Sequence, residues 1–125
     1  MGALRMEKRT RAPACARFTI RSERGPNEHR IRVFGEMDLA VTGELDRELR
    51  RVEASDAPRI VLDLDGLDFL DASGAGLLFD LGSRSLRDGS RLRVRGASSH
   101  QVRRVLDVTG IGPTLPFEDL SSAAA

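Results

Sequence analysis

Hydrophobic and polar residues alternate in two segments near the beginning of the chain. Phe18 and Ile20 alternate with polar neighbours, and so do Ile31 and Val33. A period of two is typical of strands that bury one face. Residues 25–27 lie between the segments and read Gly-Pro-Asn, which are turn formers. The pattern therefore predicts a β-hairpin.

Apolar residues next recur at spacings of three and four, which places them on one face of a helix. The set comprises Val41, Leu45, Leu49 and Val52. We expect Thr42 to cap this helix at its beginning and the helix to end before Pro58.

Residues 60–64 form an apolar run that only Asp63 interrupts. Such a run is typical of a strand that is covered on both faces. We therefore expect a central strand here, with a loop from its end to Leu70. A second helix is predicted over residues 72–86, with Gly89 placed to stop it.

Arg91, Arg93 and Arg95 alternate with two apolar residues, which predicts a short strand with one buried face. The row of arginines on the other face either is solvated or contacts a partner. These two interpretations stay open at the level of the sequence.

The last elements are a helix and a weak strand. Ser98 and Gln101 have the three-residue spacing of a capping box and open a helix that should end at Gly110. Residues 115–117 read Leu-Pro-Phe, and the proline restricts any strand here to a sheet edge.

The order of elements indicates an α/β fold. After the hairpin, strands and helices alternate, which is typical of parallel strands joined by right-handed crossovers. Binding sites in such sheets lie beyond the carboxyl ends of the strands. Asp38 follows the second strand and Ser73 follows the third. If those strands are neighbours, the two residues share one surface.

Composition limits the class of protein. The chain has 125 residues, of which 40% are hydrophobic, so we expect one domain with a modest core. No apolar stretch approaches the roughly 20 residues of a membrane helix, and we expect a cytoplasmic protein without a membrane span. Cys15 is the only cysteine, and His29 and His100 are the only histidines. We expect no metal site and no cofactor.

The charge is unevenly distributed. Residues 1–17 carry five basic side chains against one acidic, a net +4, whereas the remainder carries 15 basic and 18 acidic side chains, a net −3. No aromatic residue before Phe18 is available to stack on bases. We expect a disordered leader over residues 1–15, a domain over 16–120 and a flexible tail over 121–125, with no direct binding of nucleic acid.

Ser73 carries the clearest candidate chemistry. It lies in the segment Asp71-Ala72-Ser73-Gly74, where a strand turns into a helix. Backbone N–H groups and the positive end of a helix favour an anion at such a position. Three interpretations follow from the residues alone: a phosphate acceptor, a helix cap or a nucleophile.

Two segments carry a resemblance to a known family. Gly35-Glu36-Met37-Asp38 and Leu70-Asp71-Ala72-Ser73-Gly74-Ala75-Gly76, together with the helices between and after them, resemble the STAS domain family, specifically bacterial anti-sigma factor antagonists. The resemblance covers about residues 16–119. It implies a single α/β domain with a mixed, mostly parallel sheet of four to five strands and three or more helices.

The resemblance also implies a mechanism called partner switching. The unphosphorylated protein binds a serine-kinase anti-sigma factor and releases a sigma factor, phosphorylation at Ser73 abolishes that binding, and a serine phosphatase resets the protein. The protein itself is then no enzyme, and we expect a monomer or weak dimer. The implied partner-binding residues are Asp38, Asp71, Ser73, Gly74, Ala75 and Gly76.

The sequence departs from the usual family pattern at three positions. Ala72 replaces a frequent small hydroxyl residue, Ala75 replaces a larger apolar residue, and Gly43 stands where proline often starts the helix. The acceptor serine is present in spite of these differences. The change at Ala75 bears on which partner is recognised.

Other functions remain as alternatives. Some STAS domains are subunits of stress-sensing or lipid-transport assemblies. The segment Asp63-Leu64-Asp65-Gly66 resembles the opening of a phosphohydrolase motif, but Leu67 replaces its threonine and the only lysine is Lys8. A serine hydrolase is disfavoured because Ser73 lacks the Gly-x-Ser-x-Gly elbow.

Overall fold

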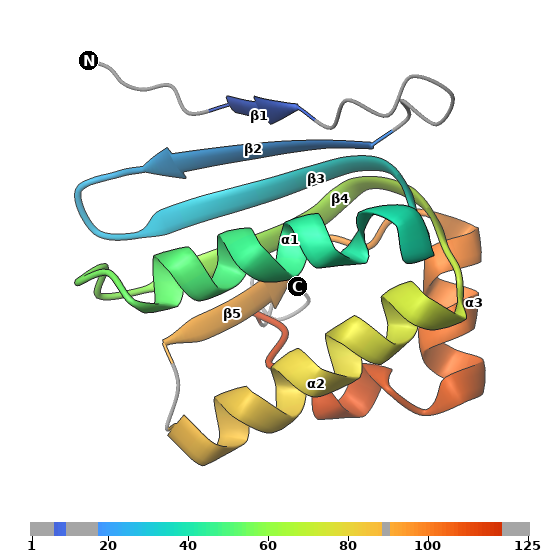
Figure 1. Ribbon diagram of the computed structural model, residues 1–125. Coiled ribbons are helices and arrows are strands. Elements are labelled where there is room, and N and C mark those ends of the chain that lie inside the picture. The colour runs from blue at the N-terminus through green and yellow to red at the C-terminus, as the bar shows by residue number, and fades with distance from the viewer. Residues whose placement is uncertain (1–6, 10–17, 89–90, 119–125) are drawn as a thin grey trace.

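A five-stranded sheet forms the framework of the computed structural model, which describes residues 7–9, 18–88 and 91–118. The strands lie side by side in the order of the sequence (Figure 1). The first two pairings are antiparallel and the last two are parallel. The strands are β1 (Glu7–Arg9), β2 (Phe18–Arg24), β3 (His29–Met37), β4 (Ile60–Leu70) and β5 (Leu92–Arg95).

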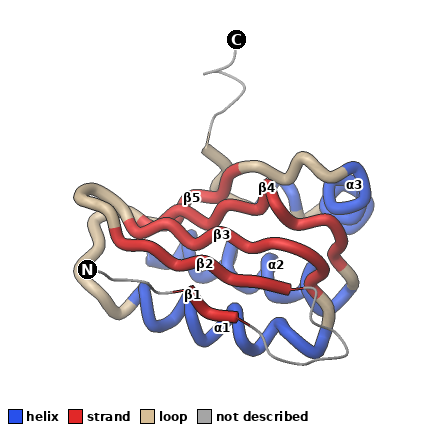
Figure 2. Tube along the Cα trace, turned by 90° about the horizontal axis from the view of Figure 1, so that it is seen from above, coloured by secondary structure: helices blue, strands red, loops and turns tan. Residues whose placement is uncertain are grey.

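The long helices cover one face of this sheet. Figure 2 views the sheet from its other face, with the strands in front of α1 and α2. Among the described residues no helix lies over that face. The predicted α/β class with a mixed sheet and three helices is confirmed. The helices are α1 (Leu39–Glu53), α2 (Ala72–Asp88), α3 (His100–Thr109) and the short 3-10 helix η1 (Gly112–Thr114).

The core lies between the sheet and the helices. The predicted apolar face of the first helix is buried as expected, with all four of its members at most 1% exposed. Full burial of one aliphatic side chain contributes about 1.5–3 kcal/mol to folding. The periodicity of the sequence therefore identified the face that holds α1 on the sheet. The largest fully buried side chains include Phe18, Ile20, Ile31, Met37, Leu45, Leu49, Leu62, Leu64 and Leu78.

The start of α1 differs from the prediction. The helix begins at Leu39 rather than near Thr42, and its N-cap is Asp38, whose carboxylate accepts a hydrogen bond from the backbone N–H of Ala40. The Thr42 hydroxyl instead donates to the carbonyl of Leu39 within the first turn. Asp and Thr are both good N-caps. Asp38 takes the position because it directly follows the last residue of β3.

β4 is longer than predicted. Residues 65–70 continue the strand and were expected to form a loop. They pair with β3 through two register shifts, one between Arg32 and Phe34 and one between Gly35 and Glu36. Gly66 makes the close pairing possible, because a Cβ at this position would lie 2.3 Å from a ring carbon of Phe34.

The predicted capping box of α3 is wrong. The N-cap is Ser99, whose hydroxyl accepts from the N–H of Val102, while Ser98 donates to the carbonyl of Asp65. Gln101 has a different role, which is described below. The predicted end of the helix is confirmed, because Gly110 adopts a left-handed conformation with a φ of 74° at the C-cap.

Three expectations concern the beginning and the end of the chain. Residues 7–9 fall within the expected leader and form the edge strand β1, while the domain boundaries stay a prediction. The last expected strand is reduced to a single bridge between Val94 and Phe117. The remaining leader, the tail and the predicted helix stop Gly89 lie outside the described residues. In the described part of the chain, no helix is long and apolar enough to cross a membrane.

Candidate functional site

The ends of β3 and β4 bring two acidic residues to the same edge of the sheet. Met37 and Leu70 are partners in the parallel register, so Asp38 and Asp71 follow at the same level. The backbone N–H of Asp71 donates to the carbonyl of Met37 over 3.2 Å. The expectation that the two polar turns share one edge is therefore confirmed by the strand order.

Asp71 connects the starts of two helices. Its carboxylate accepts from the N–H of Gly74 over 3.0 Å and from the hydroxyl of Ser73 over 2.7 Å. Burial by itself raises the pKa of Asp71, but these two bonds and the N–H groups of Ser73 and Leu39 outweigh it and hold the pKa below its ordinary value. Leu39 begins α1 and Gly74 lies in the first turn of α2.

Ser73 lies where these helix starts meet. Its side chain is partly exposed, and its hydroxyl donates to Asp71. The positive ends of two helices close together favour a negative charge at this position. The position thus has the access and the local electrostatics that a phosphorylated serine needs.

The small residues after Ser73 differ in their surroundings. Gly74 is buried, and a Cβ there would lie 2.5 Å from Leu70 Cδ1 and 3.1 Å from the carbonyl oxygen of Met37. Ala75 is only 2% exposed and belongs to the core. Gly76 is exposed, and a Cβ at this position would meet no described atom within 4 Å. Contact of Gly74, Ala75 and Gly76 with a partner stays a prediction.

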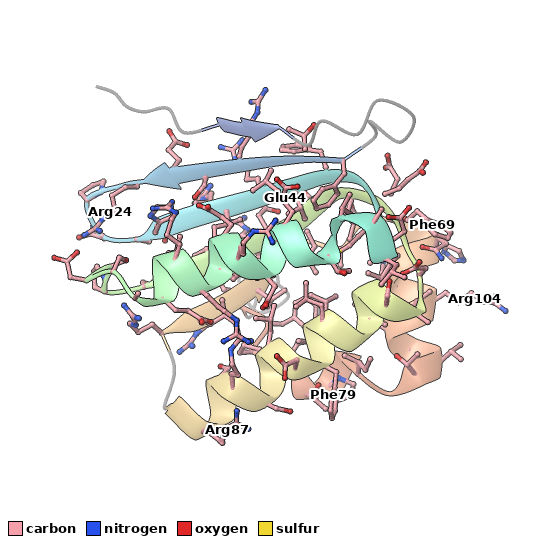
Figure 3. All side chains as sticks on the ribbon, viewed as in Figure 1. Arg24, Glu44, Phe69, Phe79, Arg87 and Arg104 are labelled. Carbon is pink, nitrogen blue, oxygen red and sulfur yellow. The ribbon has the colours of Figure 1, made fainter. Side chains whose placement is uncertain are left out.

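Two large apolar side chains are exposed near this edge and were missed in the sequence. Leu39 is 75% exposed at the start of α1, and Phe69 is 40% exposed near the end of β4. Figure 3 shows Phe69 at the end of the molecule where β4 leads into α2. Exposed apolar side chains of this size are typical contacts in protein interfaces. Leu39 was missed because the first helix was expected to begin near Thr42, and Phe69 was missed because residues 65–70 were expected to form a loop.

Gln101 fixes the end of β4 against α3. Its side-chain oxygen accepts from the N–H of Leu70 over 2.9 Å, and its side-chain nitrogen donates to the carbonyl of Leu70 over 3.1 Å. This pair of bonds copies the pattern of a neighbouring strand. Gln101 therefore holds the residue immediately before Asp71 in position.

The phosphohydrolase alternative lacks the required geometry. Asp63 and Asp65 lie within β4 rather than beyond its carboxyl end, and the Asp63 carboxylate accepts from the N–H of Asp65. Ser73 bonds to a carboxylate rather than to a histidine. Within the described ranges, no three His, Cys, Asp or Glu side chains are grouped so that they could hold a metal ion.

The fold and this edge are those of a STAS domain. The family model described as Mlab, STAS domain matches residues 20–116 of the chain. The match spans β2 to the segment after η1 and includes every element around Ser73. The chain therefore belongs to the STAS domain family.

Three solved structures to which the chain is similar are of anti-sigma factor antagonists. One from Mycobacterium paratuberculosis is 24% identical, with a TM-score of 0.69 over 82% of this chain and 86% of that one. The antagonist SpoIIAA in its unphosphorylated form is 22% identical, with a TM-score of 0.64 over 84% and 92%. Phosphorylated SpoIIAA, a Bacillus cell fate determinant, is 22% identical, with a TM-score of 0.58 over 84% and 96%.

Proposed function

We propose that this protein is an anti-sigma factor antagonist that acts by partner switching. The unphosphorylated form binds a kinase-type anti-sigma factor and thereby releases a sigma factor. The kinase phosphorylates Ser73, the complex dissociates, and a serine phosphatase restores the binding form. The observation that carries the proposal is the partly exposed Ser73 hydroxyl at the meeting point of two helix starts, held by Asp71.

The similarity to solved antagonists supports this function. One of these proteins, SpoIIAA, is known in unphosphorylated and in phosphorylated form, and both share the fold of this chain. Ser73 lies at the edge that the sequence motif indicates. A switch on this fold then requires a change of charge at the surface and no change of architecture.

The charge of a phosphate is large enough to break such an interface. Phosphorylation adds about −1.5 to −2 charges. One unit charge at roughly 5 Å from a partner carboxylate, in an effective dielectric of about 20, costs about 3 kcal/mol. A loss of that size lowers the affinity by roughly a hundredfold.

The phosphate also changes the contacts within the domain. The Ser73 hydroxyl donates its proton to Asp71 in the unmodified protein, and a phosphate ester has no such proton to give. The phosphate and the Asp71 carboxylate are both negative and repel each other, so the contact between residues 71 and 73 is lost. The same edge also carries the exposed Leu39 and Phe69, and a partner that covered these side chains would bury the phosphate at high cost.

Phosphorylation by candidate partners tests the proposal. The full chain is incubated with each kinase-type anti-sigma factor of the same genome and ATP, and the modified residue is located by mass spectrometry. We expect one phosphate on Ser73, none in Ser73→Ala, and normal modification in Ser98→Ala, which removes another exposed hydroxyl. We further expect Ser73→Asp to lower affinity for the partner by about tenfold to a hundredfold.

Two results would contradict the proposal. One is modification only at residues other than Ser73, and the other is a Ser73→Asp variant that binds its partner as tightly as the wild type. A chain that is never phosphorylated but co-purifies in a large complex would support the alternative function, a subunit of a stress-sensing or lipid-transport assembly. The match to the family model described as Mlab, STAS domain is the observation that favours this alternative function.

A further inference from the structure

The open face of the sheet carries two cross-strand rows that are rich in arginine. The register places the members of each row side by side, pointing away from α1 and α2. The two rows together hold five arginines and two acidic residues. The first row is Arg21, Arg32, Asp63 and Arg95, and the second is Glu23, Arg30, Val61 and Arg93.

Three of these arginines have no carboxylate partner among the described residues. Arg30 forms an ion pair with Glu28 over 2.8 Å. No ion pair joins a carboxylate of the described chain to Arg32, Arg93 or Arg95, although Asp63 lies between two of them in the first row. An arginine side chain has five donors in a planar fork that matches a carboxylate or phosphate.

The first row contains one pair of like charges, and Asp63 lies opposite Arg32 and Arg95. Arg21 and Arg32 are direct partners across the antiparallel pair of β2 and β3, and like charges at such positions are destabilising. The Arg21 guanidinium lies 5.7 Å from the centre of the Phe34 ring, which offsets part of that cost. The first row has three positive side chains against one negative, and this excess of positive charge suggests a role outside folding.

We propose that these two rows, which we call the arginine face, bind an acidic segment of a partner protein. Arg93 and Arg95 are two positions apart on one strand, a separation of about 6.6 Å. That spacing equals the distance between carboxylates at alternate positions of an extended acidic segment. Paired guanidinium and carboxylate groups form bidentate hydrogen bonds in this arrangement.

The composition of the rows favours a protein over a nucleic acid or a membrane. Glu23 and Asp63 interrupt the positive charge and would repel a continuous phosphate backbone, whereas an acidic segment can place neutral or basic residues opposite them. Phe34, which lies beside the rows, already has a guanidinium over its ring. Val61 is the only apolar member of the two rows, and it is 1% exposed, so it cannot insert into lipid.

The chain itself supplies no suitable occupant in its terminal segments. Residues 1–17 carry a net charge of +4, which opposes binding to a basic face, and residues 119–125 contain a single acidic residue. The arginine face also differs from the edge that carries Ser73, which lies beyond the carboxyl ends of β3 and β4. The protein can therefore bind the acidic segment and the proposed partner of Ser73 at separate surfaces.

Fluorescence anisotropy with a defined probe tests this proposal on the full chain. The probe is a labelled peptide of five Glu-Ser repeats, and a Gln-Ser peptide of the same length is the neutral control. We expect saturable binding of the acidic peptide that weakens as salt rises. Arg32→Gln combined with Arg95→Gln should lower the affinity by at least about tenfold.

A matched pair of substitutions controls for net charge. Arg47 and Arg104 are exposed on α1 and α3 and form no ion pair with described residues; Figure 3 labels Arg104. Arg47→Gln combined with Arg104→Gln removes the same two charges and should change the affinity less than twofold. Circular dichroism must show that both double variants are folded. Phosphorylation of Ser73 should be equal in the two, which separates this proposal from the proposed switch.

Four results would overturn the proposal. The first is no saturable binding of the acidic peptide, and the second is an equal loss of affinity in both double variants. The third is tighter binding of a single-stranded RNA 12-mer with the same dependence on Arg32 and Arg95, which would indicate a nucleic-acid surface. The fourth is a dimer in sedimentation experiments that only the arginine-face variant abolishes, which would make a second copy of the chain the occupant.

Discussion

Two glycines of the Ser73 edge should respond in opposite ways to the same substitution. Gly74 and Gly76 both lie in α2, two residues apart. An alanine in a helix is favoured over glycine by roughly 0.5–1 kcal/mol. At Gly76 a Cβ meets nothing within 4 Å, so Gly76→Ala should raise the free energy of unfolding by that amount.

Gly74→Ala gains the same helix propensity but meets a closed space. Its Cβ would lie 2.5 Å from Leu70 Cδ1 and 3.1 Å from the Met37 carbonyl oxygen. That carbonyl also accepts the N–H of Asp71, so it cannot move freely. Overpacking of this kind costs about 1–3 kcal/mol. We expect a net loss of about 1–2 kcal/mol, and a difference between the two variants of roughly 2 kcal/mol.

Equilibrium unfolding in urea, followed by circular dichroism, measures this difference. With a slope of about 1–3 kcal/mol/M, the two midpoints should separate on the order of 1 M in urea. Shifts in the same direction, or free energies within about 0.5 kcal/mol of each other, would refute the close approach of Gly74 to β3. The slopes should stay equal, because neither change alters the surface that unfolding exposes.

Two further predictions concern pH and the helix junction. Burial, and next the charge of Arg51, lower the pKa of His29. As pH drops, His29 therefore takes up a proton in the unfolded chain before it does so in the folded protein. The free energy of unfolding should fall as pH drops below about 6.5. Urea titrations at several pH values should show a smaller fall in His29→Gln, and equal falls would contradict the assignment. Asp71→Ala should lower the free energy of unfolding by about 1–3 kcal/mol near neutral pH. The N–H and O–H donors stabilise the charged carboxylate and lower its pKa, so this loss should shrink as pH falls below about 4 and through that lowered pKa. The exposed Asp68→Ala is the control, and a loss of equal size there would argue against the role of Asp71.

The sequence predicted the elements that depend on local periodicity. The hairpin and the buried face of α1 follow from spacings of two and of three to four residues, and these spacings need no knowledge of the partner element. The common edge of Asp38 and Ser73 could also be predicted, because parallel neighbours end on the same side. The order of the strands was the only tertiary information which that prediction needed.

Two of the missed features depend on contacts between distant segments. Gln101 forms hydrogen bonds with Leu70, which is 31 positions away in sequence. The three-residue spacing from Ser98 led to the wrong prediction of a capping box. The extension of β4 through Asp65 and Gly66 requires pairing with Phe34 of β3, and the residues themselves favour a loop. Leu39 is the first residue of α1 because Asp38 is the N-cap, and the position of this cap depends on where β3 ends.

The row of arginines near residue 93 illustrates the same limit. The sequence left open whether this row was solvated or bound a partner. Arg91 in fact donates to the carbonyls of Ser55 and Ala57, near the end of α1, and so has a structural role. Arg93 and Arg95 belong to the arginine face, which the register of four strands assembles.

The two register shifts between β3 and β4 restrict how this strand pair can change in length. Each shift gives β4 one extra residue relative to β3. Arg32 lies opposite Asp63 before the shifts, and Met37 lies opposite Leu70 after them. Because side chains alternate between the faces, one extra residue would turn the end of β4 over, and the second restores its orientation. Two residues inserted or deleted together in this stretch would therefore leave the Ser73 edge in place. A single insertion or deletion would turn buried Leu70 outward and exposed Phe69 inward.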